Sequence, residues 1–383
     1  MATVGEIVRK TTEFFQAKSE TARLDAELLI GRALSLERLQ VFLKHDQVLN
    51  EAQLEKCRAL VRRRAKGEPV AYILGEKGFY KHTFEVTPAT LIPRPETEML
   101  VVRGLEILDG KLPARGVRAK SAVQLEIAAA NARLDEAERV AALAEATHLG
   151  LDSEEINHAI EASSEFGGGA GVLAARSSNA ENRDVAVLSA ITIIDLGCGS
   201  GCIGLSIGDE IKDRADLRLI FIDISVAAIE VAKRNAAKLG LDKVSEFLVA
   251  DAGDIGAFAD LKASADLVVA NPPYIDPADT RVQAAVKEFE PAGALFAGAP
   301  GETGIAEIRR WSNIARKLAR VTGSLTTGAA LFEIGDGQGE DSIRLFNEAG
   351  WDHVKLARDL SNRERMVEAH ASDEREAHAL TEA

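Results

Sequence analysis

The sequence predicts an α/β protein in which a helical bundle precedes a seven-stranded, doubly wound sheet. Three observations support this. The first 70 residues show the apolar spacing of amphipathic helices. From about residue 185 onward, short aliphatic and β-branched runs alternate with helical segments, which is typical of a mostly parallel sheet with helices on both faces. A glycine-rich turn follows the first of these runs, where such sheets bind ligands.

Composition limits the class of protein. The chain has 383 residues, of which 46% are hydrophobic and 28% charged, as in ordinary globular proteins. Its net charge of -14 argues against a large nucleic-acid surface, and we read the basic run 62–64 as a solvated helix end. Three cysteines are too few for a disulfide framework, and Cys198 with Cys202 cannot complete a zinc site. Because we find neither a signal peptide nor a membrane span, we expect a cytoplasmic protein without bound metal.

Helical periodicity dominates the start of the chain. Leu54, Cys57 and Val61 repeat the i, i+3, i+7 spacing of a helix with one apolar face. The tripeptide 67–69, Gly-Glu-Pro, then ends the pattern. We therefore assign residues 1–70 to an N-terminal helical bundle.

Residues 71–90 predict a β-hairpin linker. They are rich in aromatic and β-branched side chains, beginning with Tyr72 and Ile73, and glycines interrupt them. This composition is more typical of two short strands and a turn than of further helix.

Residues 91–383 form the second predicted domain, which an insertion interrupts. The domain opens with Pro95 followed by two glutamates, favourable chemistry for the start of a helix that should end at Gly110. The stretch at about 111–184 is first rich in alanine and then in Gly, Ser, Asn and Arg. Such a composition indicates a helical hairpin with a flexible tether.

Seven strands are expected after the insertion, at Ile191–Asp195, Leu217–Asp223, Val244–Ala250, Leu267–Ala270, Ala330–Ile334, His353–Ala357 and Arg365–His370. Helices separate most of them. The best marked helix has Ser225 as its N-cap and Gly240 as its stop. The last two strands are joined too closely for a crossover helix, so they should form an antiparallel hairpin at one edge of the sheet.

The turn after the first of these strands predicts a cofactor site. Gly197, Gly199 and Gly201 follow an acid, Asp195, and glycine lets the backbone bend sharply and approach a ligand closely. The next strand ends in Asp223, whose carboxylate can accept from both ribose hydroxyls. By itself the segment fits NAD and S-adenosylmethionine about equally well. The preceding acid and the glycine spacing favour the methyl donor, whose carboxylate and ammonium need backbone N–H groups and an acid.

Asp251 ends the third strand and is placed to meet the adenine, with a helix N-cap as the alternative. The complete set of residues expected around the cofactor is Gly197, Cys198, Gly199, Ser200, Gly201, Asp223, Asp251, Ala252 and Asn271.

The tetrapeptide Asn271-Pro272-Pro273-Tyr274 follows the fourth strand and predicts the catalytic centre. Two prolines forbid further strand pairing and stiffen the turn. The Asn271 side-chain oxygen and the Pro272 carbonyl can then both accept from a planar NH₂ group, on which Tyr274 stacks. Fixing that nitrogen in line with a sulfonium methyl group provides much of the acceleration. We assign catalysis to Asn271, Pro272 and Tyr274, with Pro273 also binding substrate; a purely structural Pro-Pro turn is the alternative.

Further segments match one family: the stretches 67–75 and 91–98, the pairs Glu290-Pro291 and Asp359-Leu360, the tripeptide Glu333-Ile334-Gly335, and the residues Gln338 and Arg365. With them, nearly the whole chain outside the insertion resembles the peptide-chain release factor N5-glutamine methyltransferases. The tetrapeptide alone is shared with adenine and cytosine N-methyltransferases, whereas the stretch 91–98 is much more specific.

This resemblance implies the Rossmann-like fold of class I methyltransferases and S-adenosyl-L-methionine as the methyl donor. It implies transfer to the N5 amide nitrogen of the glutamine in the Gly-Gly-Gln motif of class 1 peptide chain release factors. By motif, 197–201 and Asp223 would bind the donor, Asn271 would contact donor and substrate, and 272–274 the glutamine. The N-terminal bundle would help to dock the release factor, and no direct nucleic-acid or membrane partner is expected.

Alternatives remain at this point. A glutamine methyltransferase of a ribosomal protein is the nearest, and an N6-adenine nucleic-acid methyltransferase is the next. A silent binding protein and an NAD dehydrogenase rank last. The chain also departs from the family pattern in the insertion, in the segment 299–304, and at Ala252, where the family often has an aromatic residue.

Overall fold

The computed structural model describes residues 2–110, 112, 190–301, 304–321 and 328–371. Apart from Leu112, the predicted insertion lies outside the described residues, as does the chain after Ala371. By its contacts the chain divides into two compact units, and all elements named below belong to the first, which comprises Met1–Leu112, Ile191–Asp213 and Leu217–Ala383.

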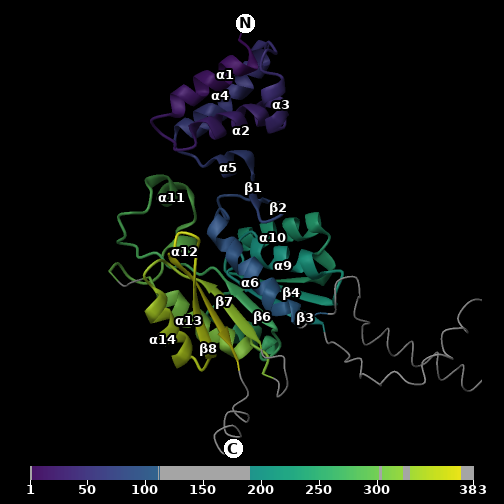
Figure 1. Cartoon of the computed structure of the whole chain (residues 1–383), viewed down its shortest axis with the longest axis vertical. Coiled ribbons are helices and arrows are strands. Elements are labelled where there is room, and N and C mark those ends of the chain that lie inside the picture. The colour runs from purple at the N-terminus through teal and green to yellow at the C-terminus, as the bar shows by residue number, and fades with distance from the viewer. Residues whose placement is uncertain (1, 111, 113–189, 302–303, 322–327, 372–383) are drawn as a thin grey trace, which may run out of the picture. The chain divides into compact units, whose positions relative to one another are not determined.

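The N-terminal bundle contains the helices α1 (Val4–Phe15), α2 (Ala22–Leu34), α3 (Arg38–Leu43) and α4 (Glu51–Ala65) (Figure 1). Reciprocal capping boxes begin α1 and α4: Thr3 pairs with Glu6, and Asn50 pairs with Gln53. Apolar side chains of these helices, including Ile30 and Cys57, form a buried cluster between them. The helical periodicity of the sequence therefore predicted this region correctly.

The linker differs from its prediction. Residues Val70–Leu74 form a short helix, α5, which Gly75 ends in a left-handed conformation at φ +75. The expectation that Tyr72 and Ile73 begin a hairpin is therefore wrong. Tyr72 and Ile73 point into two different apolar clusters. This is possible because adjacent side chains of a helix point in different directions. The hairpin itself is present, as β1 (Glu76–Phe79) paired antiparallel with β2 (His82–Glu85).

A single 3-10 turn, η1 (Pro95–Thr97), leads into helix α6 (Glu98–Asp109), where the proline and two glutamates predicted a helix start. The large sheet then follows, with the strands β3 (Ile191–Leu196), β4 (Leu217–Asp223), β5 (Ser245–Val249), β6 (Leu267–Ala270), β7 (Ala329–Glu333), β8 (Asp352–Arg358) and β9 (Glu364–His370). All seven predicted strands are confirmed to within one residue at each end.

The strand order of this sheet is β5-β4-β3-β6-β7-β9-β8. The pairs from β5 to β7 are parallel, and β9 pairs antiparallel with both β7 and β8. The predicted antiparallel hairpin at one edge is thus confirmed. The chain winds outward from β3 to β5 and then restarts at β6, so the order reverses between β3 and β6. Sheets of this kind bind ligands at the carboxyl edge of such a reversal.

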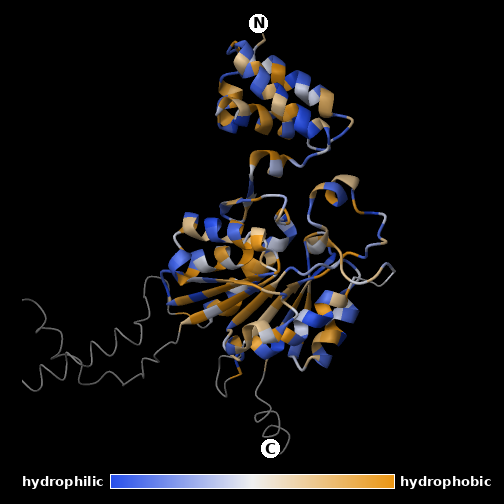
Figure 2. Cartoon of the chain, turned by 180° about the vertical axis from the view of Figure 1, so that it is seen from behind, coloured by the Kyte–Doolittle hydropathy of each residue, from blue (hydrophilic) through white to orange (hydrophobic). Residues whose placement is uncertain are grey.

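The remaining helices of the described chain are α9 (Cys202–Ile211), α10 (Val226–Leu239), η3 (Asp242–Val244), η4 (Ile255–Leu261), α11 (Ala284–Phe289), α12 (Ala292–Leu295), α13 (Ala306–Leu318) and α14 (Gly339–Glu348). Ser225 caps α10 and Gly240 ends it at φ +69, as predicted. Helix α9 contacts both α6 and α10, and α13 contacts α14. Figure 2 shows apolar strands between helices with polar outer sides. No helix of the described residues is long and apolar enough to cross a bilayer.

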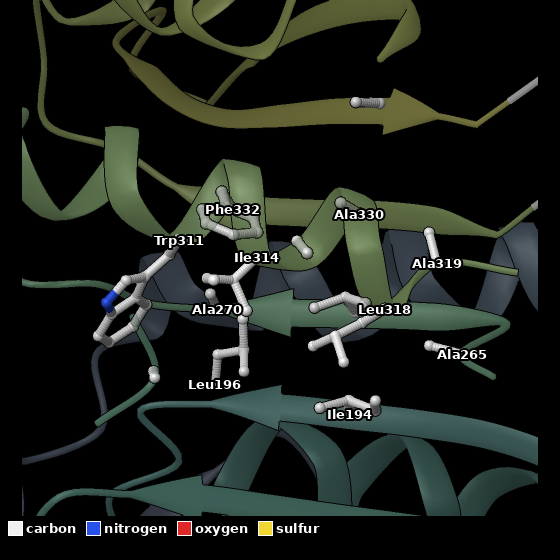
Figure 3. Packing of buried hydrophobic residues seen from close by; sticks show 14 of the residues in the cluster. Ile194, Leu196, Ala265, Ala270, Trp311, Ile314, Leu318, Ala319, Ala330 and Phe332 are labelled. Carbon is white, nitrogen blue, oxygen red and sulfur yellow. The ribbon is translucent and has the colours of Figure 1, made fainter. Parts of the chain in front are cut away.

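The core that supports the site lies between α13 and the central strands. Figure 3 shows Ile194 and Leu196 of β3 and Phe332 of β7 packed with Ile314 and Leu318 of α13, with all five side chains buried. Close packing on this face fixes the ends of β3, β6 and β7 relative to one another.

Asn235 of α10 connects the hairpin to the glycine turn. Its side chain is 1% exposed. The Oδ1 atom accepts from the Glu85 backbone N–H at 2.8 Å, and the Nδ2 group donates to the carbonyls of Glu85 at 3.1 Å and Ser200 at 2.9 Å. One buried amide therefore satisfies three backbone groups from two separate segments.

Replacing this amide should cost stability. In Asn235→Leu the three backbone groups lose their partner inside the protein, and we expect unfolding to become easier by at least about 2 kcal/mol. Urea denaturation followed by circular dichroism measures the change. The exposed Asn347 of α14 provides the matched control, since Asn347→Leu should change stability by less than about 0.5 kcal/mol. Equal effects of the two variants would contradict the role of Asn235.

Candidate active site

A cavity of about 480 Å³ lies at the carboxyl ends of β3, β4, β5 and β6. Its size is typical of pockets for small molecules and cofactors. The predicted site residues that line it are Gly197, Cys198, Gly199, Ser200, Asp223, Asp251, Ala252, Asn271 and Pro273. Gly201, Pro272 and Tyr274 were predicted with them but are not among the lining residues. The structure thus brings together most of the set that the sequence predicted.

The glycine turn after β3 is shaped by backbone geometry. Gly197, Gly199 and Gly201 have φ of +66, +53 and +77, a region that favours glycine. A Cβ on Gly199 would meet nothing within 4 Å, so this residue presents bare backbone to open space. A Cβ on Gly201 would press on Leu205 at 3.0 Å. Gly201 therefore supports the turn from the helix side, which explains its absence from the cavity wall.

Asp195, the acid before the first glycine, lies beneath the turn. Its side chain is 1% exposed and does not line the cavity. The Oδ2 atom accepts from the Gly204 N–H at 3.0 Å, and Oδ1 has no partner among the described residues. Burial raises the pKa of this carboxyl to about 7, against the opposing effect of the Gly204 N–H. Asp195 thus holds the start of α9 instead of facing the cavity.

Asp223 faces the cavity from the end of β4. One carboxylate oxygen accepts from the Gly199 N–H at 2.8 Å, and the other accepts from the Ser225 N–H at 2.8 Å. Burial raises the pKa of this carboxyl, although both N–H groups act to lower it. A carboxylate oxygen accepts two hydrogen bonds, so each oxygen retains capacity for a ligand hydroxyl.

Asp251 faces the cavity from the end of the third parallel strand. It accepts from the Gly253 N–H at 2.8 Å and from the Arg310 guanidinium of α13 at 2.7 Å. Burial acts to raise the pKa of Asp251, but these two partners outweigh it and hold that pKa below its usual value. Asp254, which accepts from the Gly256 N–H, caps the following helix η4. The alternative interpretation of Asp251 as a helix N-cap is therefore wrong.

The tetrapeptide turn after β6 is held by a chain of hydrogen bonds. The Asn271 Nδ2 group donates to the Thr97 hydroxyl at 3.3 Å, and that hydroxyl donates to Glu333 Oε2 at 2.5 Å. The Tyr274 hydroxyl donates to the other oxygen of Glu333 at 2.9 Å. Glu333 ends β7 and is only 2% exposed. A buried carboxyl group therefore lies at the centre of the site.

The direction of these bonds determines how Asn271 points. An ionised carboxylate only accepts, so the Thr97 hydroxyl gives its proton to Glu333 and offers its lone pair to Asn271. Only the NH₂ side of the Asn271 amide can use that lone pair. The amide oxygen is then left as an acceptor, and Asn271 lines the cavity. This is the orientation that a donor such as a planar NH₂ group requires.

Two further contacts brace the same turn. Gln338 donates from Nε2 to the Tyr274 carbonyl at 2.9 Å and accepts from the Gly335 N–H at 2.8 Å. Gly304 lies so close that a Cβ there would be 2.1 Å from the backbone carbonyl oxygen of Tyr274. The backbone of Tyr274 is therefore fixed from two directions.

Glu290 ties the segment 89–97 to the cavity. Its carboxylate accepts from the Ile92 N–H at 3.1 Å and from the Arg94 guanidinium at 2.5 Å. The same segment supplies Leu91, Pro93 and Thr97 to the cavity wall. Contacts between distant stretches of the chain therefore complete the site.

Four residues of the site received no role from the sequence: Thr97, Glu290, Glu333 and Trp311. The first three lie in segments that carried the family resemblance, which was the available signal. Trp311 of α13 also lines the cavity, and no pattern in the sequence pointed to it.

The described residues contain no cluster of His, Cys, Asp and Glu that could hold a metal ion. The basic run 62–64 is paired with acids: Arg62 with Glu55 at 2.7 Å, Arg63 with Glu68, and Arg64 with Asp25 at 2.9 Å. These arginines are therefore engaged in ion pairs within the chain, although the side chains of Arg62 and Arg63 remain exposed to solvent.

Comparison with known proteins agrees with this geometry. Residues 6–75 match the model of the PrmC N-terminal domain, and residues 188–299 match that of a methyltransferase domain. The chain is 31% identical over 370 residues to the release factor glutamine methyltransferase of Nitratidesulfovibrio vulgaris, covering 96% of this chain and 94% of the relative. It is 32% identical over 297 residues to the release factor glutamine methyltransferase of Chlorobaculum tepidum, covering 77% of this chain and 75% of the relative. It is 29% identical over 354 residues to that of Haemophilus influenzae, covering 91% of each.

The buried Asp195 should make stability depend on pH. A carboxyl whose pKa is raised in the folded state stabilises the fold while it is protonated. This contribution is complete below the ordinary pKa of 3.8 and is gone once the pH passes about 7. Between these limits it falls by about 1.4 kcal/mol per pH unit.

Asp195→Asn should therefore remove a decline in stability that the unchanged protein shows between pH 5 and about 7. Urea denaturation of both proteins across this range measures the difference. Parallel stability curves for the two proteins would show that Asp195 is ionised in the folded protein over this whole pH range.

Proposed function

The chain belongs to the family of release factor glutamine methyltransferases, and we propose that its cavity binds S-adenosyl-L-methionine beside a release factor glutamine held by Asn271-Pro272-Pro273-Tyr274. The observation that carries the proposal is the orientation of Asn271, whose NH₂ group is bound by Thr97 and whose oxygen remains available. The reaction is the methylation of a release factor glutamine. Relatives with this name favour neither a ribosomal protein nor an adenine base as the substrate.

The residues of the cavity fit the methyl donor. Gly199 leaves open space where a side chain would otherwise stand, and its N–H already binds Asp223. The two oxygens of Asp223 retain acceptor capacity for the hydroxyls of a ribose. Asp251 and Ala252 line the same cavity and are assigned to the adenine. These features support S-adenosyl-L-methionine as the cofactor.

The catalytic turn suits an amide nitrogen, which is a poor nucleophile because its lone pair is delocalised. When bound, S-adenosyl-L-methionine supplies an electrophilic methyl group on a positively charged sulfur. Asn271 Oδ1 and the Pro272 carbonyl accept the two N–H bonds of the substrate and point its nitrogen at that group. These acceptors bind the nitrogen more strongly as positive charge develops on it. The Tyr274 ring, held through its hydroxyl by Glu333, offers a flat face to the planar amide.

The protein partner is a class 1 release factor, with the glutamine of its Gly-Gly-Gln motif as the acceptor. The N-terminal bundle is assigned to docking it. Leu39, Phe42 and Leu43 of α3 support this assignment, because large apolar side chains that are 67–68% exposed are typical of protein contact surfaces. The cytoplasmic location expected from the sequence is part of the same proposal.

Methylation can be tested directly with purified chain, purified release factor and isotopically labelled S-adenosyl-L-methionine. Mass spectrometry of the Gly-Gly-Gln peptide should show one labelled methyl group on the glutamine. A release factor with that glutamine replaced by alanine is the control and should stay unlabelled. Cofactor binding without label on any release factor would refute the assigned substrate.

Asn271→Ala should separate catalysis from cofactor binding. Because it removes an acceptor of the reacting amide, we expect kcat to fall at least about 100-fold. Affinity for S-adenosylhomocysteine, measured by calorimetry, should fall less than about 10-fold, since most of the cavity is unchanged. Asn313→Ala, an exposed amide on α13, is the matched control and should keep full activity. A small loss of kcat in Asn271→Ala would remove this residue from the catalytic set.

The hydrogen-bond chain from Asn271 to Glu333 should matter for kcat more than for affinity. Thr97→Val keeps the shape of the side chain but removes the hydroxyl, so Asn271 loses its anchor. We expect kcat to fall about 10- to 100-fold, with full recovery in Thr97→Ser, which restores the hydroxyl. Equal activity of the valine and serine variants would show that Thr97 only fills space.

The same series of hydrogen bonds predicts that activity is lost in acid. Burial raises the pKa of Glu333, although Thr97, Tyr274 and Arg365 act to lower it. Among the titratable groups, Tyr274 is hydrogen-bonded to Glu333, and Arg365, Glu96 and Cys202 interact with it electrostatically. When Glu333 is protonated it can donate to Thr97, which removes the constraint on Asn271.

The kcat should therefore fall as the pH drops through this raised pKa. Glu333→Gln should have low kcat at every pH and no acid limb in the pH profile. An unchanged acid limb in Glu333→Gln would assign the limb to another group.

A further inference from the structure

Trp311 of α13 combines deep burial with an unused hydrogen-bond donor. The side chain is 7% exposed, and its Nε1–H has no partner among the described residues. Figure 3 shows the indole at the end of the packed cluster, beyond Leu196, with its nitrogen turned away from Ile314 and Leu318. Trp311 also lines the cavity described above. The Nε1 atom has essentially no exposed surface of its own, so a ligand in the cavity would meet the carbon atoms of the indole and not this N–H.

The position of this indole is fixed by the glycine turn. A Cβ on Gly197 would lie 2.5 Å from the Trp311 ring, so the ring rests directly on the backbone of the turn. The preceding residue, Arg310, is held by Asp251 at 2.7 Å, which anchors this part of α13 to the end of the third strand. Trp311 therefore belongs to the wall that carries Asp251 and Ala252.

Ala252 leaves that wall without a side chain beyond Cβ. It is 4% exposed and shares an apolar cluster with Trp311. Within the described chain, Phe296 and Trp311 are the aromatic residues that line this cavity, and Trp311 is the one that shares the apolar cluster with Ala252. Its large flat face suits a purine, because aromatic rings stack favourably.

We propose that Trp311 is a cofactor-binding residue of this chain, whose indole forms part of the wall against which the adenosine of the ligand packs. The proposal rests on the proposed function, since it takes S-adenosyl-L-methionine as the ligand. The second tryptophan, Trp351, provides the contrast. It is 3% exposed, and its Nε1 donates to the Ser312 carbonyl at 3.0 Å. Trp351 is thus satisfied within the fold and is not among the residues that line the cavity, whereas Trp311 lines it.

Fluorescence offers a direct test, because the chain contains only these two tryptophans. In Trp351→Phe, Trp311 is the sole tryptophan, and its emission should change saturably as S-adenosylhomocysteine is added. In Trp311→Phe, only Trp351 remains, and its emission should not respond. If calorimetry shows that Trp351→Phe binds the ligand while the emission of Trp311 stays constant, the proposal is overturned. This outcome requires no substitution of Trp311 itself.

Affinity provides the second measurement. Trp311→Leu loses the aromatic ring, so the Kd for S-adenosylhomocysteine should rise about 3- to 10-fold. Trp311→Phe keeps a smaller ring, and its Kd should rise less. Trp351→Phe is the matched control and should bind as the unchanged protein does. Unchanged Kd in both Trp311 variants would overturn the proposal.

The assignment to the nucleoside is tested with methylthioadenosine, which lacks the amino-acid arm. The Trp311 variants should weaken it by the same factor as S-adenosylhomocysteine. A loss seen with S-adenosylhomocysteine alone would refute contact with the adenosine. If the unchanged protein binds neither compound, the proposed function fails first; if it binds both and the variants bind equally well, only the role of Trp311 fails.

Discussion

The buried carboxyl of Glu333 is the constraint on which the arrangement of the site depends. A carboxylate can only accept hydrogen bonds, so the hydroxyls of Thr97 and Tyr274 must both donate to it. The direction of the next hydrogen bond, between Asn271 and Thr97, follows from this, and with it the orientation of the Asn271 amide. A single carboxyl group of β7 thereby determines which atom of the Asn271 amide is free to face the cavity.

The acids at the carboxyl ends of β3, β4 and β5 follow a similar rule, because each accepts from at least one backbone N–H. Asp195 holds Gly204, Asp223 holds Gly199, and Asp251 holds Gly253. The carboxylates thus shape the turns that form the cavity before any ligand is considered. Asp195 serves only this purpose and does not line the cavity, whereas Asp223 and Asp251 also line it. Preorganisation of this kind lowers the cost of binding.

The segments that carried the family resemblance are the ones that complete the site. The stretch 91–98 supplies Thr97, and Glu290 ties this stretch to the loop before α12. These residues lie far apart in the sequence, since 236 positions separate Thr97 from Glu333. The tetrapeptide is common to methyltransferases with different substrates, and its surroundings therefore distinguish this family.

Sequence alone determined the strands, the edge hairpin, the glycine turn and the Asn-Pro-Pro-Tyr turn, because local periodicity and turn chemistry encode them. It failed at Tyr72 and Ile73, whose β-branched and aromatic character suggested strand, because two separate apolar clusters stabilise a short helix there. Only the tertiary structure decided that Asp195 lies under the turn, that Glu333 orients Asn271, and that Trp311 reaches the cavity. Each of these depends on contacts between residues on different elements, and no local pattern records such contacts.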